Sequence, residues 1–192
     1  MKFKSMTILL LFITASLISS GDEYKLDTII SKLEVDGTST LHDWTLNLKK
    51  MTAKMTGRVS ESENSPFNLE KLEFKCKVED LKSSLESMDD VMYEAMNTEK
   101  HKYIIYKLKK VDSTWEQDGK TWMQTIGDLT IHGVTKEVLM KVEIAEQSDA
   151  FQFLGSESFN MSEFGIEPPS AMFGTINSGD KITIRFDVTF IQ

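Results

Sequence analysis

The chain contains a single cysteine, Cys76, among its 192 residues. One cysteine cannot form an internal disulfide, so the fold must be stabilised without covalent cross-links. Cys76 lies in the alternating apolar run from Leu72 to Val78. We therefore expect it to pack as a small buried hydrophobic side chain rather than to act as a reactive thiol.

Histidine and the common catalytic motifs are also scarce. His42, His101 and His132 are far apart in sequence and form no HxH or HxxxH pattern, so the usual spacing of metal ligands is missing. The chain has no GxSxG nucleophile elbow, no GxGxxG and no P-loop. We expect a protein that is not an enzyme, with no catalytic residue, metal ligand or cofactor. The alternative is an enzyme of unrecognised mechanism, in which His132 or His42 would meet carboxylates in a pocket.

Long apolar runs are missing except at the N-terminus. Lys2 and Lys4 precede an uncharged stretch over residues 6–18, and small residues follow it. This is the layout of a secretory signal peptide, and the stretch is shorter than the ~20 residues that span a bilayer as a helix. We predict a signal peptide over residues 1–21 and a periplasmic or otherwise extracytoplasmic, secreted protein. An uncleaved anchor helix is the alternative.

Positive charge is in the minority. The formal net charge is −8, and loss of Lys2 and Lys4 with the leader would make the mature protein more negative. An acidic protein is repelled by nucleic acid and by anionic lipid surfaces, so we expect no nucleic-acid partner. One basic run stands out, and we interpret it as a solvated strand edge. It comprises Lys100, His101, Lys102, Lys107, Lys109 and Lys110.

The dominant pattern along residues 22–192 has a period of two. It is clearest in the last segment, where Ile182, Ile184 and Phe186 alternate with polar residues. Such alternation is typical of half-buried strands, and many short strands joined by turns favour a sandwich or a barrel. No second apolar segment is long enough to span a bilayer as a helix, so we expect no stable membrane insertion. The sequence predicts one all-β domain over residues 22–192.

One segment follows a helical period instead. Its apolar residues recur at intervals of three and four, which is one face of an amphipathic helix, predicted over about residues 88–98. Ser87 is positioned to cap this helix, and Asp89 and Asp90 lie in its first turn, where the helix dipole favours negative charge. The apolar face is formed by Met88, Val91, Met92, Ala95 and Met96.

Four further segments are more specific than periodicity, and in order and spacing they resemble the YceI-like family. The resemblance covers roughly residues 24–192 and implies an eight-stranded antiparallel lipocalin-like barrel with one inserted amphipathic helix. It also implies a central tunnel for a polyisoprenoid-type lipid, such as an isoprenoid quinone, and no agreed enzymatic activity. The segments are Gly37–Trp44, Ser87–Tyr106, Gly127–Lys136 and Phe159–Asp180.

These observations lead to a candidate site on the inner wall of the barrel. Burial of each methylene-sized group contributes ~0.8 kcal/mol, so an apolar lipid needs no charged anchor. We predict that alternating residues of the barrel wall contact the ligand and that three helix methionines close one end of the barrel. The predicted ligand-binding residues are Leu33, Val35, Leu46, Phe74, Met88, Met92, Met96, Ile105, Leu129, Met140, Phe159, Met161 and Phe186.

The leading hypothesis is therefore an exported, soluble protein that binds an apolar lipid for carriage or storage. A second hypothesis is a non-catalytic structural or interaction module with a filled barrel, acting through its acidic surface or through the Gly37–Trp44 loop. A third is an outer-membrane barrel, because about 170 residues match eight spanning strands. Each of these hypotheses is compatible with a homodimer.

Overall fold

The computed structural model of the protein describes residues 21–62, 65–147 and 149–192. The predicted signal peptide falls on residues 1–20, outside the described residues, and on Gly21. In the described ranges, no helix combines the length and the apolar character needed to cross a membrane.

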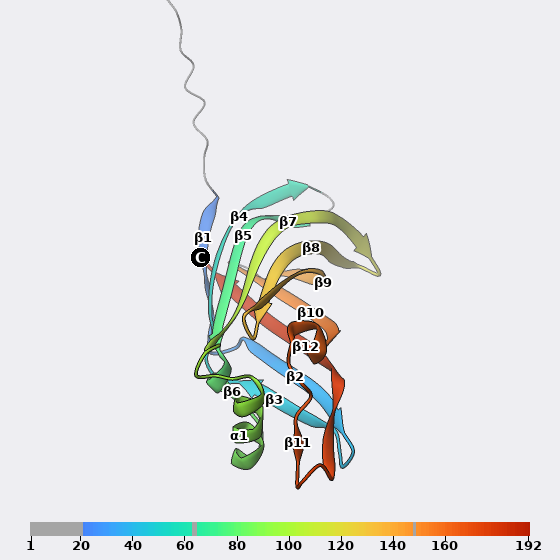
Figure 1. Ribbon diagram of the computed structural model, residues 1–192. Coiled ribbons are helices and arrows are strands. Elements are labelled where there is room, and N and C mark those ends of the chain that lie inside the picture. The colour runs from blue at the N-terminus through green and yellow to red at the C-terminus, as the bar shows by residue number, and fades with distance from the viewer. Residues whose placement is uncertain (1–20, 63–64, 148) are drawn as a thin grey trace, which may run out of the picture.

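Eight antiparallel strands form a closed ring, as the family resemblance implied (Figure 1). Consecutive ring strands are hydrogen-bonded neighbours, and the first and last strands close the ring through the pairs Lys25–Ile191 and Leu26–Phe190. The fold is therefore all-β and barrel-like. In ring order, the strands are β1 (Asp22–Leu26), β4 (Thr52–Ser62), β5 (Ser65–Lys77), β7 (Tyr103–Gln117), β8 (Lys120–Ile131), β9 (Val134–Gln147), β10 (Ala150–Asn160) and β12 (Ile176–Ile191).

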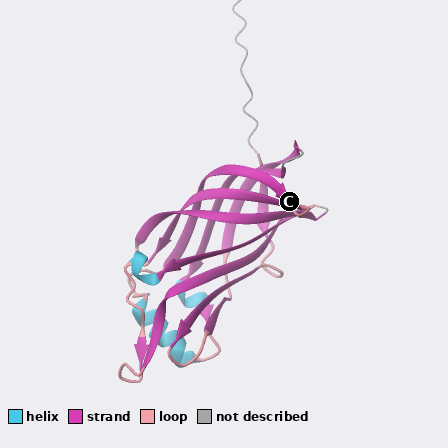
Figure 2. Ribbon diagram, turned by 90° about the vertical axis from the view of Figure 1, so that its right-hand side faces the viewer, coloured by secondary structure: helices cyan, strands magenta, loops and turns pink. Residues whose placement is uncertain are grey.

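Four further strands extend the ring at one end, a feature that the eight-strand prediction did not include. β2 (Lys32–Ser39) pairs with β12, β3 (Trp44–Leu48) pairs with β2, and β6 (Leu81–Lys82) pairs with β3. β11 (Ser170–Ala171) pairs with the start of β12. Figures 1 and 2 show these strands gathered with the helices at the end of the barrel away from the C-terminus.

The inserted helix α1 spans Glu86–Ala95, so it begins two residues before the predicted range and ends three residues before its close. Ser87 is not its cap: Leu85 occupies the N-cap position, and no side chain caps the helix there. At the other end, Asn97 adopts a left-handed conformation (φ 46°), which stops the helix although the apolar period continues to Met96. Two short 3₁₀ helices, η1 (Val78–Asp80) and η2 (Met161–Phe164), complete the fold.

An aromatic cluster fills the end of the barrel opposite α1. Phe67 on β5 is almost fully buried, and its ring centroid lies 5.1 Å from that of Tyr24 and 4.4 Å from that of Phe151. Edge-to-face and tilted rings at these distances are favourable beyond their burial alone. Phe153 and Phe190 extend the same buried cluster. This end of the barrel is a packed core.

We predict that Phe67→Ala lowers the free energy of unfolding by about 3–5 kcal/mol, because it removes a buried ring and leaves a cavity. Urea titration followed by circular dichroism measures the change. The control is Leu139→Ala on the outer face of β9, where the side chain is 52% exposed and the expected loss is below about 0.5 kcal/mol. Equal losses at the two positions would contradict the assignment of the core.

Candidate functional site

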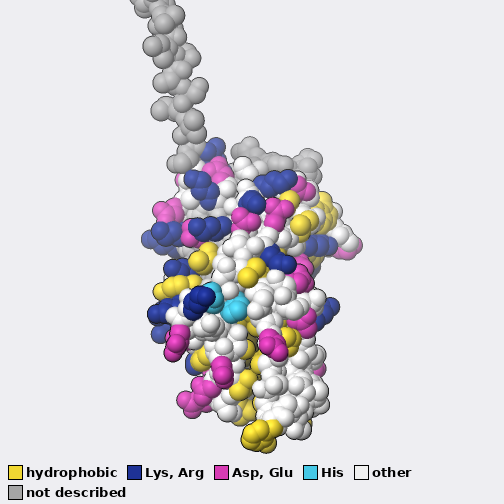
Figure 3. All heavy atoms as spheres, viewed as in Figure 1, with side chains coloured by type: hydrophobic (Ala, Val, Ile, Leu, Met, Phe, Trp, Pro, Cys, Tyr) yellow, Lys and Arg dark blue, Asp and Glu magenta, His cyan; other side chains and the backbone are white. Residues whose placement is uncertain are grey.

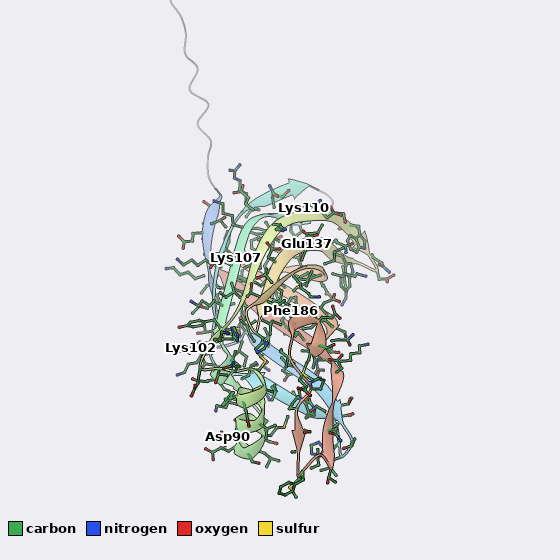
Figure 4. All side chains as sticks on the ribbon, in the orientation of Figure 1. Asp90, Lys102, Lys107, Lys110, Glu137 and Phe186 are labelled. Carbon is green, nitrogen blue, oxygen red and sulfur yellow. The ribbon has the colours of Figure 1, made fainter. Side chains whose placement is uncertain are left out.

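The middle of the barrel encloses a cavity of about 130 Å³, which we call the inner chamber. Side chains from the inward positions of the ring strands and from β2 and β6 line it, and nearly all of them are apolar. Phe186 on β12 is among them and lies in the middle of the barrel (Figure 4). The aromatic cluster closes the chamber at one end, since Phe153 and Phe190 belong to both.

A second cavity, of about 420 Å³, lies at the end of the barrel that carries α1. We call it the mouth pocket. Its walls are the apolar face of α1, the loop between β2 and β3, the helix η2 and the hairpin of β11 and β12. The lining is mostly apolar, with a few polar side chains such as Ser39 and His42.

The two cavities share a boundary of five apolar residues. Each of these residues lines both cavities, so the inner chamber and the mouth pocket are adjacent and follow one another into the barrel. The shared residues are Val35, Leu81, Ile104, Phe159 and Ile184. An elongated apolar molecule that entered at the mouth would have to pass between them to reach the inner chamber.

Twelve of the thirteen predicted ligand-binding residues line one or both cavities. Whether they contact a ligand stays a prediction, but the structure brings them together around one path. Leu33, Phe74, Leu129, Met140 and Phe186 line the inner chamber; Leu46, Met88, Met92, Met96 and Met161 line the mouth pocket; Val35 and Phe159 line both.

The prediction for Ile105 is wrong in its geometry. Ile104 and Tyr106 line the inner chamber, so their neighbour Ile105 lies on the outer side of β7, paired with Thr130 and Lys75. Strand residues alternate between the two faces of a sheet, and a shift of one residue exchanges the faces. The four successive apolar or aromatic residues from Tyr103 to Tyr106 gave no alternation from which the correct face could be read.

Polar contacts of Asp89 and Tyr93 attach α1 to the strand beneath it. The buried Asp89 carboxylate accepts a hydrogen bond from the Ser83 backbone N–H at 2.7 Å and lies 3.4 Å from the Lys82 ammonium. Burial alone would raise the pKa of Asp89, but the hydrogen bonds from Ser83 and the Lys82 charge hold it below its ordinary value. The Tyr93 hydroxyl donates to the backbone carbonyl oxygens of Glu79 and Leu81. These contacts orient the methionine face of α1 toward the mouth pocket.

Cys76 is buried, as the sequence predicted, and its side chain lines the inner chamber. Burial raises the pKa of the Cys76 thiol to about 12, and the nearby Asp80 carboxylate contributes to the shift. The thiolate is the nucleophilic form of cysteine, so a thiol that stays protonated at neutral pH is unreactive. In this chain, Cys76 is part of an apolar wall.

The three histidines do not converge on one site: His101 and His132 lie together, and His42 lies at the mouth pocket. His101 and His132 stack edge to face with ring centroids 4.7 Å apart, and neither lines the inner chamber or the mouth pocket. Desolvation lowers the pKa of His101, and the neighbouring His132 and Lys100 lower it further. His42 lines the mouth pocket, but its Nδ1 contacts the Asp43 backbone carbonyl oxygen rather than a carboxylate. Across the described ranges, no three His, Cys, Asp or Glu side chains are arranged to hold a metal ion.

Three lysines of the basic run, Lys107, Lys109 and Lys110, form ion pairs on the outer surface of β7. Lys107 lies 3.7 Å from Glu73, and Lys109 lies 3.2 Å from Asp128. Lys109 also contacts Glu137 on β9, which Figure 4 shows near β7. The exposed lysines of β7 therefore face carboxylates on a solvated surface. The interpretation as a strand edge is wrong, because β7 is paired on both sides, with β5 and with β8.

The family model for the YceI-like domain matches residues 24–190. The chain belongs to the YceI-like family. Among curated protein sequences, none matches it.

Solved structures with the same fold support the YceI-like assignment. BcnA of Burkholderia cenocepacia has a TM-score of 0.68 at 14% identity, covering 85% of this chain and 98% of its own. A polyisoprenoid-binding domain from Saccharophagus degradans, implicated in plant cell wall breakdown, has a TM-score of 0.66 at 9% identity. The match covers 88% of this chain and 97% of that domain. The YCEI protein of Campylobacter jejuni has a TM-score of 0.57 at 16% identity. The match covers 100% of this chain and 99% of that protein's chain.

Several residues that line the inner chamber or the mouth pocket were not predicted from the sequence. Ile184 carried a usable signal, because it lies two positions from the predicted Phe186 on an alternating strand. Leu41, Leu85 and Met172 line the mouth pocket from loops, where no periodicity identifies a facing side. Glu157, a carboxylate on an inward position of β10, interrupts the apolar lining of the inner chamber.

We predict that Asp89→Ala lowers the free energy of unfolding by about 1.5–3 kcal/mol, because it removes charge-assisted hydrogen bonds that hold α1. Asp90→Ala is the matched control: Asp90 is the adjacent carboxylate and lies on the exposed side of α1 (Figure 4). Its expected effect is within about 0.5 kcal/mol. Chemical denaturation of both variants measures the difference, and equal effects would show that Asp89 does not anchor α1.

We also predict that Cys76 does not react with a thiol reagent such as dithiobis-nitrobenzoate at pH 8 in the folded protein. The raised pKa keeps the thiol protonated at that pH, and burial excludes the reagent. In guanidinium chloride, the reaction should go to one thiol per chain. Rapid labelling without denaturant would contradict the placement of Cys76.

Proposed function

We propose that this YceI-like protein binds an apolar lipid of the isoprenoid or quinone type within the inner chamber and the mouth pocket. The observation that carries the proposal is the pair of adjacent apolar cavities, of about 130 and 420 Å³, joined at one boundary. Their combined size falls within the about 300–1,000 Å³ of small-molecule sites. The polyisoprenoid-binding domain of Saccharophagus degradans, which shares the fold, gives independent support.

Simple energetics support a ligand held mainly by burial. At ~0.8 kcal/mol for each methylene-sized group, one five-carbon isoprene unit contributes roughly 3–4 kcal/mol. Association costs about 4–15 kcal/mol in lost freedom, so a few units are sufficient for binding. The proposal therefore requires neither a charged anchor nor a covalent bond.

The open cavities favour this function over a structural module with a filled barrel. A packed barrel interior leaves few voids larger than a water molecule. Here the aromatic cluster fills one end of the barrel, whereas the other end is open and apolar. A protein that served only as a rigid module would gain stability by filling this space.

We further propose that the protein carries or stores its lipid outside the cytoplasm and catalyses no reaction. The leader-like pattern of residues 1–21 supports export. Ion pairs on the outer faces of the ring, such as Lys120 with Glu143 and Arg185 with Asp36, support an aqueous environment for the folded domain. A lipid enclosed in a barrel can cross that aqueous space without exposing its chain to water.

The test is native mass spectrometry of the gently purified protein, together with solvent extraction of its lipids. We expect an additional mass that matches an extracted lipid. Met92→Glu, which places a carboxylate in the mouth pocket, should reduce rebinding of an isoprenoid alcohol such as geranylgeraniol at least about tenfold, because burying an unpaired charge is costly.

The control variant is Leu139→Glu, which makes the same change of charge on the outer face of β9 and should bind like the wild type. Circular dichroism confirms that both variants fold. A clean ligand-free mass, lipid-free extracts and no rebinding of geranylgeraniol would together refute the proposal.

A further inference from the structure

Exposed apolar side chains surround the opening of the mouth pocket. They come from three separate segments: the β2–β3 loop, the turn before α1 and the β11–β12 hairpin. Figure 3 shows hydrophobic side chains at the tip of the molecule, over the β11–β12 hairpin. We call these four residues the apolar rim: Leu41, Leu85, Met172 and Phe173, with exposed fractions of 66%, 55%, 69% and 111%.

The apolar rim is continuous with the proposed ligand site. Leu41, Leu85 and Met172 line the mouth pocket with one part of their surface and face solvent with the rest. Phe173 lies next to Met172 at the tip of the hairpin and is fully exposed. Whatever covers the rim therefore also covers the entrance to the pocket.

The hairpin holds Phe173 outward at a conformational cost. Met172, Phe173 and Gly174 are consecutive residues with positive φ angles of 52°, 55° and 84°. The left-handed region is unfavourable for large side chains such as Met and Phe, and such strain gathers at functional sites. Backbone hydrogen bonds from Gly174 to Ala171 and from Thr175 to Met172 fix the turn. The fold thus maintains a strained turn that presents an unburied aromatic ring.

The β2–β3 loop and the hairpin form one side of the rim together. The Thr40 backbone N–H donates to the Asn177 carbonyl oxygen, and the Asn177 N–H donates back to Thr40 Oγ1. Thr40 Oγ1 also donates to the Thr175 carbonyl oxygen. Leu41 and Phe173 are therefore carried by segments that are tied to each other, opposite Leu85 and α1.

The charges around the rim restrict what can cover it. The rim segments, residues 39–44, 84–91 and 167–177, contain no lysine or arginine, and their charged residues are acidic. A second copy that met this surface symmetrically would place acid against acid. An anionic lipid surface would be repelled for the same reason. A neutral, zwitterionic lipid surface carries no such penalty and accepts inserted aromatic and aliphatic side chains.

We propose that the apolar rim docks on a neutral lipid surface, with Phe173 and Met172 inserted, so that lipid passes between the bilayer and the mouth pocket without crossing water. This inference rests on the proposed lipid-binding function and adds to it a surface, a partner and an orientation. The barrel would stand with its α1 end on the membrane and its aromatic cluster away from it.

The test is flotation of the mature protein with vesicles of dioleoyl phosphatidylcholine. We expect the wild type to float with the vesicles and Phe173→Ser to bind them about tenfold more weakly or worse, because the inserted ring is lost. Val59→Ser is the matched control: Val59 is 62% exposed on β4, toward the other end of the barrel, and its loss should leave vesicle binding unchanged. Replacing a third of the lipid by phosphatidylglycerol should weaken binding by the wild type.

A second measurement separates this inference from the proposed function. Native mass spectrometry follows binding of geranylgeraniol added from solution, without vesicles, and Phe173→Ser should bind it like the wild type. Geranylgeraniol binding without vesicle binding would overturn the docking proposal and leave the lipid-binding function intact, and binding to neither would overturn both. A strict requirement for phosphatidylglycerol, or a dimer that Phe173→Ser converts to a monomer, would also overturn it.

Discussion

The split pairing of β12 is the constraint on which the rest of the architecture depends. The end of β12 pairs with β1 and closes the ring, whereas its middle pairs with β2, from Asp187–Lys32 to Ile182–Gly37. One long strand therefore belongs both to the closed barrel and to the β2–β3–β6 extension. Without the first pairing the ring would have open edges, and without the second the mouth pocket would lose the wall that faces α1.

The middle of the barrel is hollow because of where the large aromatic side chains and the glycines lie along the strands. At one end, Phe67 and its aromatic neighbours fill the interior. In the middle, Tyr106 and Phe186 lie over Gly127 and Gly155, where a Cβ atom would collide with either ring. These glycines let the two rings lie flat against the wall instead of crossing the chamber, so the space between remains open. At the far end, α1 forms one wall of the mouth pocket and is attached through Asp89 and Tyr93 to the segment that precedes it.

Sequence periodicity located most of the strands and the inward faces, because one buried face imposes strict alternation. It failed at Tyr103–Tyr106, where every residue is apolar or aromatic, and Ile105 was assigned to the wrong face. The ends of α1 depend on the Ser83–Asp89 contact and on the left-handed Asn97, which are tertiary and local backbone effects that a helical period does not encode. The rim residues lie on loops, so only the assembled structure brings Leu41, Leu85 and Met172 to one opening.

The polar groups inside the barrel bear on selectivity. The Tyr106 hydroxyl donates to Thr125 Oγ1, which donates to the Met140 carbonyl oxygen, so both hydroxyls have partners within the wall. Burial raises the pKa of Tyr106, which keeps its hydroxyl protonated and neutral. Because these two hydroxyls are already paired, a ligand in the inner chamber gains little from presenting a polar group to them. Apart from the Glu157 carboxylate, which also lines the inner chamber, selection then depends on length and shape: the aromatic cluster fixes how deep a chain can reach, and the five boundary residues limit its width. A lipid longer than this path would have to leave its remaining length, and with it any polar head, at the mouth between α1 and the β11–β12 hairpin.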